Sequence, residues 1–182
     1  MKTDDKALCI QYKGLSNGEH QYKFDVHRDF FESIEDSIIE DGDFAVVLDL
    51  TKTDQMLKMR FDISGTIHTT CDVCLDPMDF AIEHCGGSII AKFGDHYEEL
   101  SDELYLIDEN DNEISVAQYI YEFIAVSMPI QFKHPEDADG NPTCNPQMIQ
   151  KLRQYSAERE TTPDSVDPRW EALKGLVNKN NN

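Results

Sequence analysis

The chain has 182 residues and a mass of 20.9 kDa, which is enough for one hydrophobic core and too short for two independent catalytic domains. Hydrophobic residues make up 40% of the chain and charged residues 29%, a balance that excludes both a membrane-embedded protein and a wholly disordered one. The 36 acidic and 16 basic residues give a formal net charge of -20, which opposes binding to a phosphate backbone through a broad basic surface.

The cysteine content and the first residues indicate the compartment. No apolar segment typical of a secretion signal follows Met1, and no run approaches the roughly 20 apolar residues that span a bilayer. The five cysteines are an odd number in a chain too large to need a disulfide framework. We therefore expect a cytoplasmic protein with reduced thiols or a metal site.

Several segments have the alternation of apolar and polar residues that is typical of strands. Residues 7–12 and 21–26 predict a hairpin or two paired edge strands. Residues 44–50 and 56–69, joined by a short polar segment, predict a β-hairpin, and the period of two is strictest at Leu57, Met59, Phe61 and Ile63. One or two further strands are predicted after Cys74.

Helical periodicity appears in three segments. The first is 29–40, where Asp29 can act as the N-cap, Gly42 can end the helix, and apolar residues recur every four positions at Phe30, Ile34 and Ile38. The second, at 115–127, has the most regular apolar spacing. A short third helix is predicted at 147–153.

Two segments have unusual charge. Residues 95–113 contain nine acidic and no basic side chains, which predicts a solvated loop that projects from the domain. Residues 146–182 contain six basic and five acidic side chains, so the acidic excess lies almost wholly in residues 1–145, with ten basic and 31 acidic ones. We expect residues 156–182 to form a flexible tail with a short amphipathic segment at 167–177.

The tail contains a candidate partner-binding group. Trp170, the single tryptophan of the chain, is next to Arg169, and Lys174 follows one turn later. Tryptophan and arginine are enriched at binding hot spots. A lone amphipathic segment must bury its apolar side somewhere, so it either binds a partner or docks on its own domain; the sequence leaves both open.

The pair Cys71 and Cys74 is the strongest chemical signal, because the Cys-x-x-Cys spacing lets two thiolates face one ion across a tight turn. A tetrahedral zinc site needs two more ligands. His134 and Cys144 are the preferred completion, since both lie in a polar segment after the second helix, where a metal would fix irregular backbone. Other possible ligands are Cys85, His68 and His84.

Two other interpretations of the cysteine pair stay open. The thiols could be plain buried side chains, as Cys9 and Cys85 are expected to be. They could also be a redox pair, but strands are predicted on both sides of the pair and Pro77 follows closely, whereas a thioredoxin-like site would begin a helix. The chain has no phosphate-binding glycine loop, nucleophile elbow or His-Glu-x-x-His helix, which disfavours an enzyme.

Together these patterns predict an α+β fold, with an antiparallel sheet packed against two or three helices. The domain is expected to comprise residues 1–155, with residues 156–182 as the tail.

Several short motifs occur together in the order found in one known family. They are the strand-Gly-strand element around Gly65, the Cys-x-x-Cys-Leu element at 71–75, and a helix followed by Met128 and Pro129. The chain resembles the YceD family, the large ribosomal RNA subunit accumulation proteins. The likeness covers most of residues 8–155, and the tail element at 167–170 also looks like endings seen in that family.

The resemblance implies a non-enzymatic factor in ribosome biogenesis that supports accumulation of large-subunit (23S) ribosomal RNA. Many family members carry further cysteines after the helix-Pro element, where this chain has His134 and Cys144. The charge of -20 favours a basic ribosomal protein or a large-subunit precursor particle as the partner, with RNA contacted indirectly or through the tail. The alternative is a small zinc-stabilised or redox-active thiol protein unrelated to ribosomes.

Overall fold

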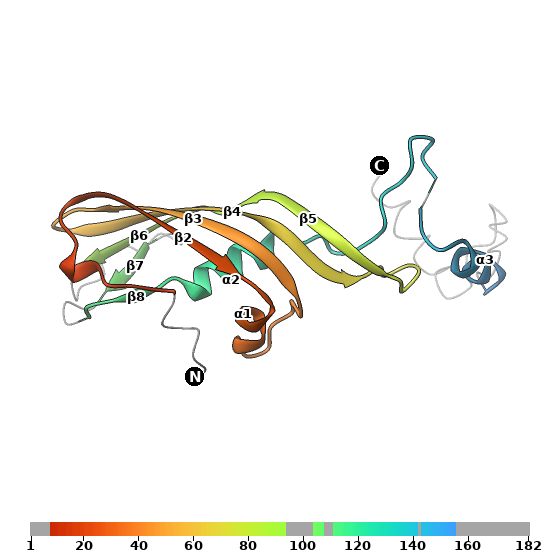
Figure 1. Cartoon of the computed structure of the whole chain (residues 1–182), viewed down its shortest axis with the longest axis horizontal. Coiled ribbons are helices and arrows are strands. Elements are labelled where there is room, and N and C mark those ends of the chain that lie inside the picture. Colours follow the sequence, from red (N-terminus) through yellow and green to blue (C-terminus); the bar gives the residue numbers. More distant parts are fainter. Residues whose placement is uncertain (1–7, 94–103, 108–110, 142, 156–182) are drawn as a thin grey trace, which may run out of the picture.

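A computed structural model describes residues 8–93, 104–107, 111–141 and 143–155 (Figure 1). None of the helices in these ranges is long and apolar enough to cross a membrane.

A single sheet of six strands forms the frame of the described domain. Its strands are β2 (Gly18–Val26), β3 (Gly42–Lys52), β4 (Met56–Thr70), β5 (Pro77–Cys85), β6 (Ser88–Phe93) and β7 (Leu104–Ile107). The order is β2-β3-β4-β6-β7, and β5 also pairs with β4. All neighbouring strands are antiparallel except β6 and β7, which are parallel. The sheet therefore has one parallel pair at an edge.

Strand β4 is the central element of the sheet because it changes partner along its length. Residues 56–60 pair with β6, and residues 63–70 pair with β5. The register shifts between Ile63 and Gly65, where the strand is irregular. A Cβ atom at Gly65 would lie 2.2 Å from the carbonyl oxygen of Asp43, so only glycine fits where β3 approaches this bend.

One side of the sheet is covered by the helices α1 (Arg28–Ser33) and α2 (Ala117–Val126), and by the small pair β1 (Cys9–Ile10) and β8 (Ile114–Ser115), as Figure 1 shows. A 3-10 turn, η1 (Tyr12–Gly14), follows β1. The alternation of β3 and β4 turns every second side chain toward this layer, and residues such as Leu48, Met59 and Ile63 are completely buried. In α2, the residues Ile120 and Ile124 complete the core.

Helix α3 (Pro146–Tyr155) lies apart from this core, beyond the tip of the β4–β5 hairpin (Figure 1). None of its described residues is buried. Its position depends on a second, small cluster around Cys71, Cys74 and Cys144.

The predicted α+β class is confirmed: the described residues contain three α-helices and a largely antiparallel sheet. The predicted strands at 44–50 and 56–69 correspond to β3 and β4, and β5 and β6 follow the cysteine pair. The predicted helices at 115–127 and 147–153 correspond to α2 and α3. The tail at 156–182, with its segment 167–177, lies outside the described residues.

The predicted helix at 29–40 is wrong in its extent. Helix α1 ends at Ser33, with His27 rather than Asp29 at its N-cap, and Ile34 is already extended. Asp36 then adopts a positive φ of 58°, which turns the chain. Ile38 is consequently 67% exposed instead of continuing an apolar face, and Gly42 begins β3.

The predicted pairing of residues 7–12 with 21–26 is also wrong. Residues Cys9 and Ile10 pair with β8, which lies more than 100 residues later, and β2 pairs along its whole length with β3.

The acidic segment 95–113 contains β7 in its described part, so the prediction of one continuous loop is wrong. Ile107 of this strand is buried and joins the core.

Candidate metal centre

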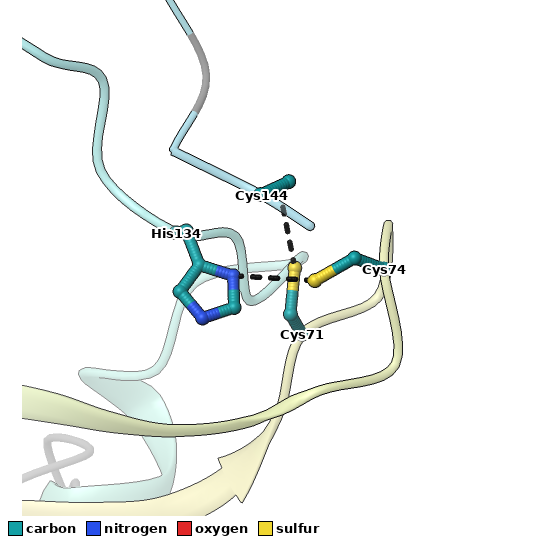
Figure 2. A group of neighbouring side chains, drawn as sticks. All are labelled: Cys71, Cys74, His134 and Cys144. Carbon is teal, nitrogen blue, oxygen red and sulfur yellow. Dashed lines mark hydrogen bonds between the residues drawn. The ribbon is translucent and has the colours of Figure 1, made fainter. Parts of the chain in front are cut away.

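Four predicted ligands meet at the tip of the β4–β5 hairpin. Cys71 and Cys74 lie on the turn that joins the two strands, whereas His134 and Cys144 come from the segment between α2 and α3 (Figure 2). Their ligand atoms all lie within 4.8 Å of one another. The three cysteines are at most 5% exposed, and His134 is half-buried.

Two distances between ligand atoms match those of a tetrahedral zinc ion. Ligands at ~2.3 Å for sulfur and ~2.0 Å for nitrogen stand roughly 3.8 Å apart for two sulfurs and roughly 3.5 Å apart for a sulfur and a nitrogen. The Sγ atoms of Cys71 and Cys144 are 3.7 Å apart, and Cys74 Sγ is 3.4 Å from His134 Nδ1. Three cysteines and one histidine are also a donor set that structural zinc sites use. The residues present therefore fit zinc.

The local backbone makes the two hairpin thiols converge. The N–H of Leu75 donates to the carbonyl oxygen of Cys71 at 2.8 Å, and the N–H of Cys71 donates to that of Asp76 at 2.9 Å. Leu75 has a positive φ of 62°, which lets the chain reverse immediately after Cys74. This tight turn brings both thiols to the same site (Figure 2).

Asp72, between the two cysteines, fastens the segment that carries His134. Its N–H donates to the carbonyl oxygen of Phe132 at 2.8 Å, and its carboxylate accepts from the N–H of Phe132 at 2.7 Å. The ring of Phe132 packs edge-on against Phe80 of β5, with centroids 5.3 Å apart. These contacts fix the chain two residues before His134.

Asn145 holds the chain next to Cys144 in place. Its side-chain oxygen accepts from the N–H of Gln147 at 3.0 Å, so it caps α3, with Pro146 at the first helical position. Its side-chain amide donates to Asp76 at 3.1 Å. The start of α3 is thereby tied to the cysteine turn, directly beside Cys144.

The electrostatics of the site favour a thiolate at Cys71. Burial alone would raise the pKa of this thiol, but the backbone N–H groups of Cys74, Val73 and His134 and the side chain of His134 bring it down to about 6. Burial and the neighbouring thiols Cys71 and Cys74 raise the pKa of Cys144. A cation between these sulfurs would relieve the repulsion that opposes a second thiolate.

The other residues considered as ligands lie elsewhere. Cys85 is part of the main core, where burial raises the pKa of its thiol. His68 hydrogen-bonds to Asp79 and Asp43, and His84 to Asp62, on the outer face of the sheet. The proposed partner-binding residues of the tail lie outside the described residues: Arg169, Trp170 and Lys174.

The four candidate ligands predicted from the sequence lie together, but the residues that position them, Asp72, Asp76 and Asn145, were not predicted. For one of them a signal was present: Asn145 followed by Pro146 is a typical start of a helix. The hydrogen bonds of Asp72 and Asp76 join residues about 60 to 70 positions apart, and no local pattern indicates such contacts.

Comparisons with known proteins agree with the motif resemblance. No curated protein and no solved structure matches the chain. One family model matches residues 59–177, from β4 through the cysteine turn, α2 and α3 and into the tail, and leaves residues 8–58 outside. Its description is large ribosomal RNA subunit accumulation protein YceD, and because the match extends over more than half of the chain, the chain belongs to the YceD family.

Proposed function

We propose that the protein is a non-enzymatic ribosome biogenesis factor, which supports accumulation of 23S ribosomal RNA by binding a basic ribosomal protein or a large-subunit precursor particle. The observation that carries this proposal is the strongly acidic chain of a family named for large ribosomal RNA accumulation. A role on ribosome precursors would place its action in the cytoplasm.

The distribution of charge supports a protein partner rather than bare RNA. No charged side chain is buried among the described residues, so their acidic excess faces the solvent. A surface of this sign repels phosphate groups and attracts lysine- and arginine-rich proteins, with association rates that fall as salt rises. Ribosomal proteins are strongly basic, and an acidic domain could hold one until its RNA site forms.

The metal centre supports a structural rather than a catalytic role. When bound, zinc would be held by Cys71, Cys74, His134 and Cys144 and would supply folding energy to the segment that carries α3. Four protein ligands complete a tetrahedral set and leave no position for a substrate, which is the arrangement of structural sites.

A redox-active or merely zinc-stabilised thiol protein remains the second candidate. The lowered pKa of Cys71 favours reactivity, but this thiol is fully buried, whereas redox cysteines are exposed to their substrates. Reaction of the purified protein with an alkylating reagent tests this candidate. Rapid modification of Cys71 in the zinc-loaded protein would favour it over the structural centre.

The proposed partner class is tested by capture of purified large-subunit ribosomal proteins on the immobilised full chain. We expect capture of at least one of them at low salt and its release at high salt, because the attraction is electrostatic. Absence of capture at low salt would contradict the proposal. If the tail touches RNA through Arg169, Trp170 and Lys174, Trp170→Ala is expected to abolish that contact and to spare ribosomal protein binding.

A further inference from the structure

A groove of about 640 Å³ that is open to the solvent lies between the main core and the candidate metal centre. Four parts of the chain line it: Arg28 at the start of α1, the connection after α1, the facing ends of β4 and β5, and the chain that leaves α2. It is separate from the metal ligands, none of which lines it.

The floor of the groove is apolar and adaptable. Ile67 of β4, Met78 of β5, and Met128 and Phe132 beyond α2 all line it, and apart from the buried Ile67 these side chains are half-buried. Ile38 stands at its edge with 67% of its surface exposed. Flexible methionine side chains are well suited to a partner whose apolar side chains vary.

The wall that carries Ile38 is held in place. The N–H of Ile38 donates to the hydroxyl of Tyr121 in α2 at 3.0 Å, and the hydroxyl of Ser37 donates to the carbonyl oxygen of Ile39 at 2.8 Å. Ile39 itself is buried in the core. The exposure of Ile38 is therefore imposed by the fold, and it places a large apolar side chain where a partner could cover it.

The rim of the groove is acidic on both sides. Glu40 and Asp41 line one wall and Asp79 the other, and the basic lining residues are Arg28 and His68, of which His68 pairs with Asp79 at 2.7 Å. Arg28 is engaged with Glu32 at 2.9 Å and with Asp41 at 3.6 Å. Residues 27–43, which frame this wall, contain seven carboxylates and a single arginine.

From this combination we infer that the groove is the docking site for a basic, amphipathic segment of a protein partner. The apolar side chains of this segment would cover Ile38, Met78 and Met128. Its lysine or arginine side chains would face Glu40 and Asp79, where they would add to the contact that Asp79 makes with His68. Charge complementarity selects this occupant, because phosphate groups or an acidic segment would be repelled by the rim. The inference rests on the proposed function in taking the partner to be basic, and it adds the surface that binds it.

The test uses the zinc-loaded full chain and a fluorescein-labelled peptide of alternating lysine and leucine, with fluorescence anisotropy as the readout. The variant Glu40→Lys, Asp79→Lys reverses the rim, and Asp25→Lys, Glu83→Lys makes the same change in net charge at exposed positions outside the groove. We expect the rim variant to weaken peptide binding at least about tenfold, and the matched control to weaken it much less.

A second pair of variants tests the apolar contact without changing charge. Ile38→Ser removes an exposed side chain at the groove, and Val126→Ser removes one on α2, 87% exposed, that does not line it. Only Ile38→Ser is expected to weaken binding, and both exposed positions leave the core intact. The inference would be overturned if the rim variant and its charge control bound the peptide equally well. It would also be overturned if a glutamate-leucine peptide bound as tightly as the lysine-leucine peptide, or if the chain self-associated through Ile38.

The peptide assay contains no ribosomal protein, so the two proposals can fail separately. If the peptide binds in the groove but no ribosomal protein is captured, the docking site is supported and the proposed function is contradicted. If a ribosomal protein is captured and the rim and Ile38→Ser variants bind it as well as wild type does, the proposed function is supported and the docking site is contradicted.

Discussion

The sulfur atoms of Cys71 and Cys144 lie 3.7 Å apart although 73 residues separate them in the chain. The contact joins the turn between β4 and β5 to the residues just before α3. The small cluster around it is separate from the main core, which contains Cys85 but none of the four candidate ligands. The candidate metal site therefore lies in a cluster of its own, apart from the core of the sheet.

The first prediction concerns metal content. The purified protein should contain about one equivalent of zinc, and Cys71→Ser should lose it because three ligands hold zinc poorly. Cys9→Ser is the control, since this cysteine lies in β1 and not in the cluster. Inductively coupled plasma mass spectrometry measures the content. Retention of zinc by Cys71→Ser would show that the four side chains are not the site.

Removal of the metal with a chelator should loosen α3 and leave the sheet folded, because the two clusters share no described core residue. Hydrogen exchange resolved by peptide measures this. Amides of 146–155 and of the cysteine turn should exchange much faster, and those of β3 and β4 should be unchanged. Cooperative loss of protection in β3 and β4 would contradict the separation of the two clusters.

Asn145→Ala should destabilise the start of α3. The substitution removes the helix cap and the hydrogen bond to Asp76, and the loss of an N-cap side chain costs about 1 kcal/mol. Zinc affinity should fall with it, since Cys144 is the adjacent residue. Gln150→Ala, at an exposed position of the same helix, is the control. Competition with a chromophoric chelator measures the affinity, and equal values for both variants would refute the positioning role of Asn145.

Gly65→Ala should destabilise the sheet by roughly 1–3 kcal/mol, the usual cost of overpacking a well-ordered core. Its new Cβ would meet the carbonyl oxygen of Asp43 at 2.2 Å and Phe44 at 2.6 Å. Gly14→Ala is the matched control, because nothing lies within 4 Å of a Cβ there. Chemical denaturation compares the two, and similar free energies of unfolding would contradict the close approach of β3 to β4.

The pH dependence of stability should reveal the outer-face ion pairs. Asp79 and then Asp43 raise the pKa of His68, and His27 and His68 lower that of Asp43. The contribution of His68 is complete below its ordinary pKa and is lost as pH rises through its raised value, whereas that of Asp43 is lost as pH falls through its lowered value. The Tm of wild type should thus be higher than that of His68→Gln, and the difference should be largest near about pH 5 and smallest near about pH 9.

A constant difference in Tm across this range would show that His68 stabilises the sheet without its charge. All three side chains are more than a third exposed, so the difference should shrink as salt is added.

The features that could be predicted from sequence are those with a local physical cause. The strict alternation at Leu57, Met59, Phe61 and Ile63 determines which side of β4 is buried, and the spacing of Ile120 and Ile124 does the same for α2. The candidate metal ligands could also be predicted, because a Cys-x-x-Cys pair needs two further ligands to complete a tetrahedral site and few histidines or cysteines follow it in the chain.

The features that sequence did not predict depend on distant partners. The spacing of Phe30, Ile34 and Ile38 favours a helix, but Asp36 turns the chain so that β3 can start at Gly42, and Ile38 is left exposed. The strand character of residues 9–10 was recognisable, whereas their pairing with 114–115 has no local signal. Strand β7 was likewise not predicted, because acidic residues surround it in the sequence and it is stabilised by pairing with its parallel neighbour β6.

The measurement that tests the central claim most directly is the ratio of large-subunit to small-subunit ribosomal RNA in cells depleted of this protein. Depleted cells are complemented with wild type, with a Cys71→Ser, Cys74→Ser copy, or with Cys9→Ser as the control. A selective large-subunit deficit, rescued by wild type and Cys9→Ser but not by the double variant, is the predicted result. An unchanged ratio after depletion would contradict a role in large-subunit RNA accumulation.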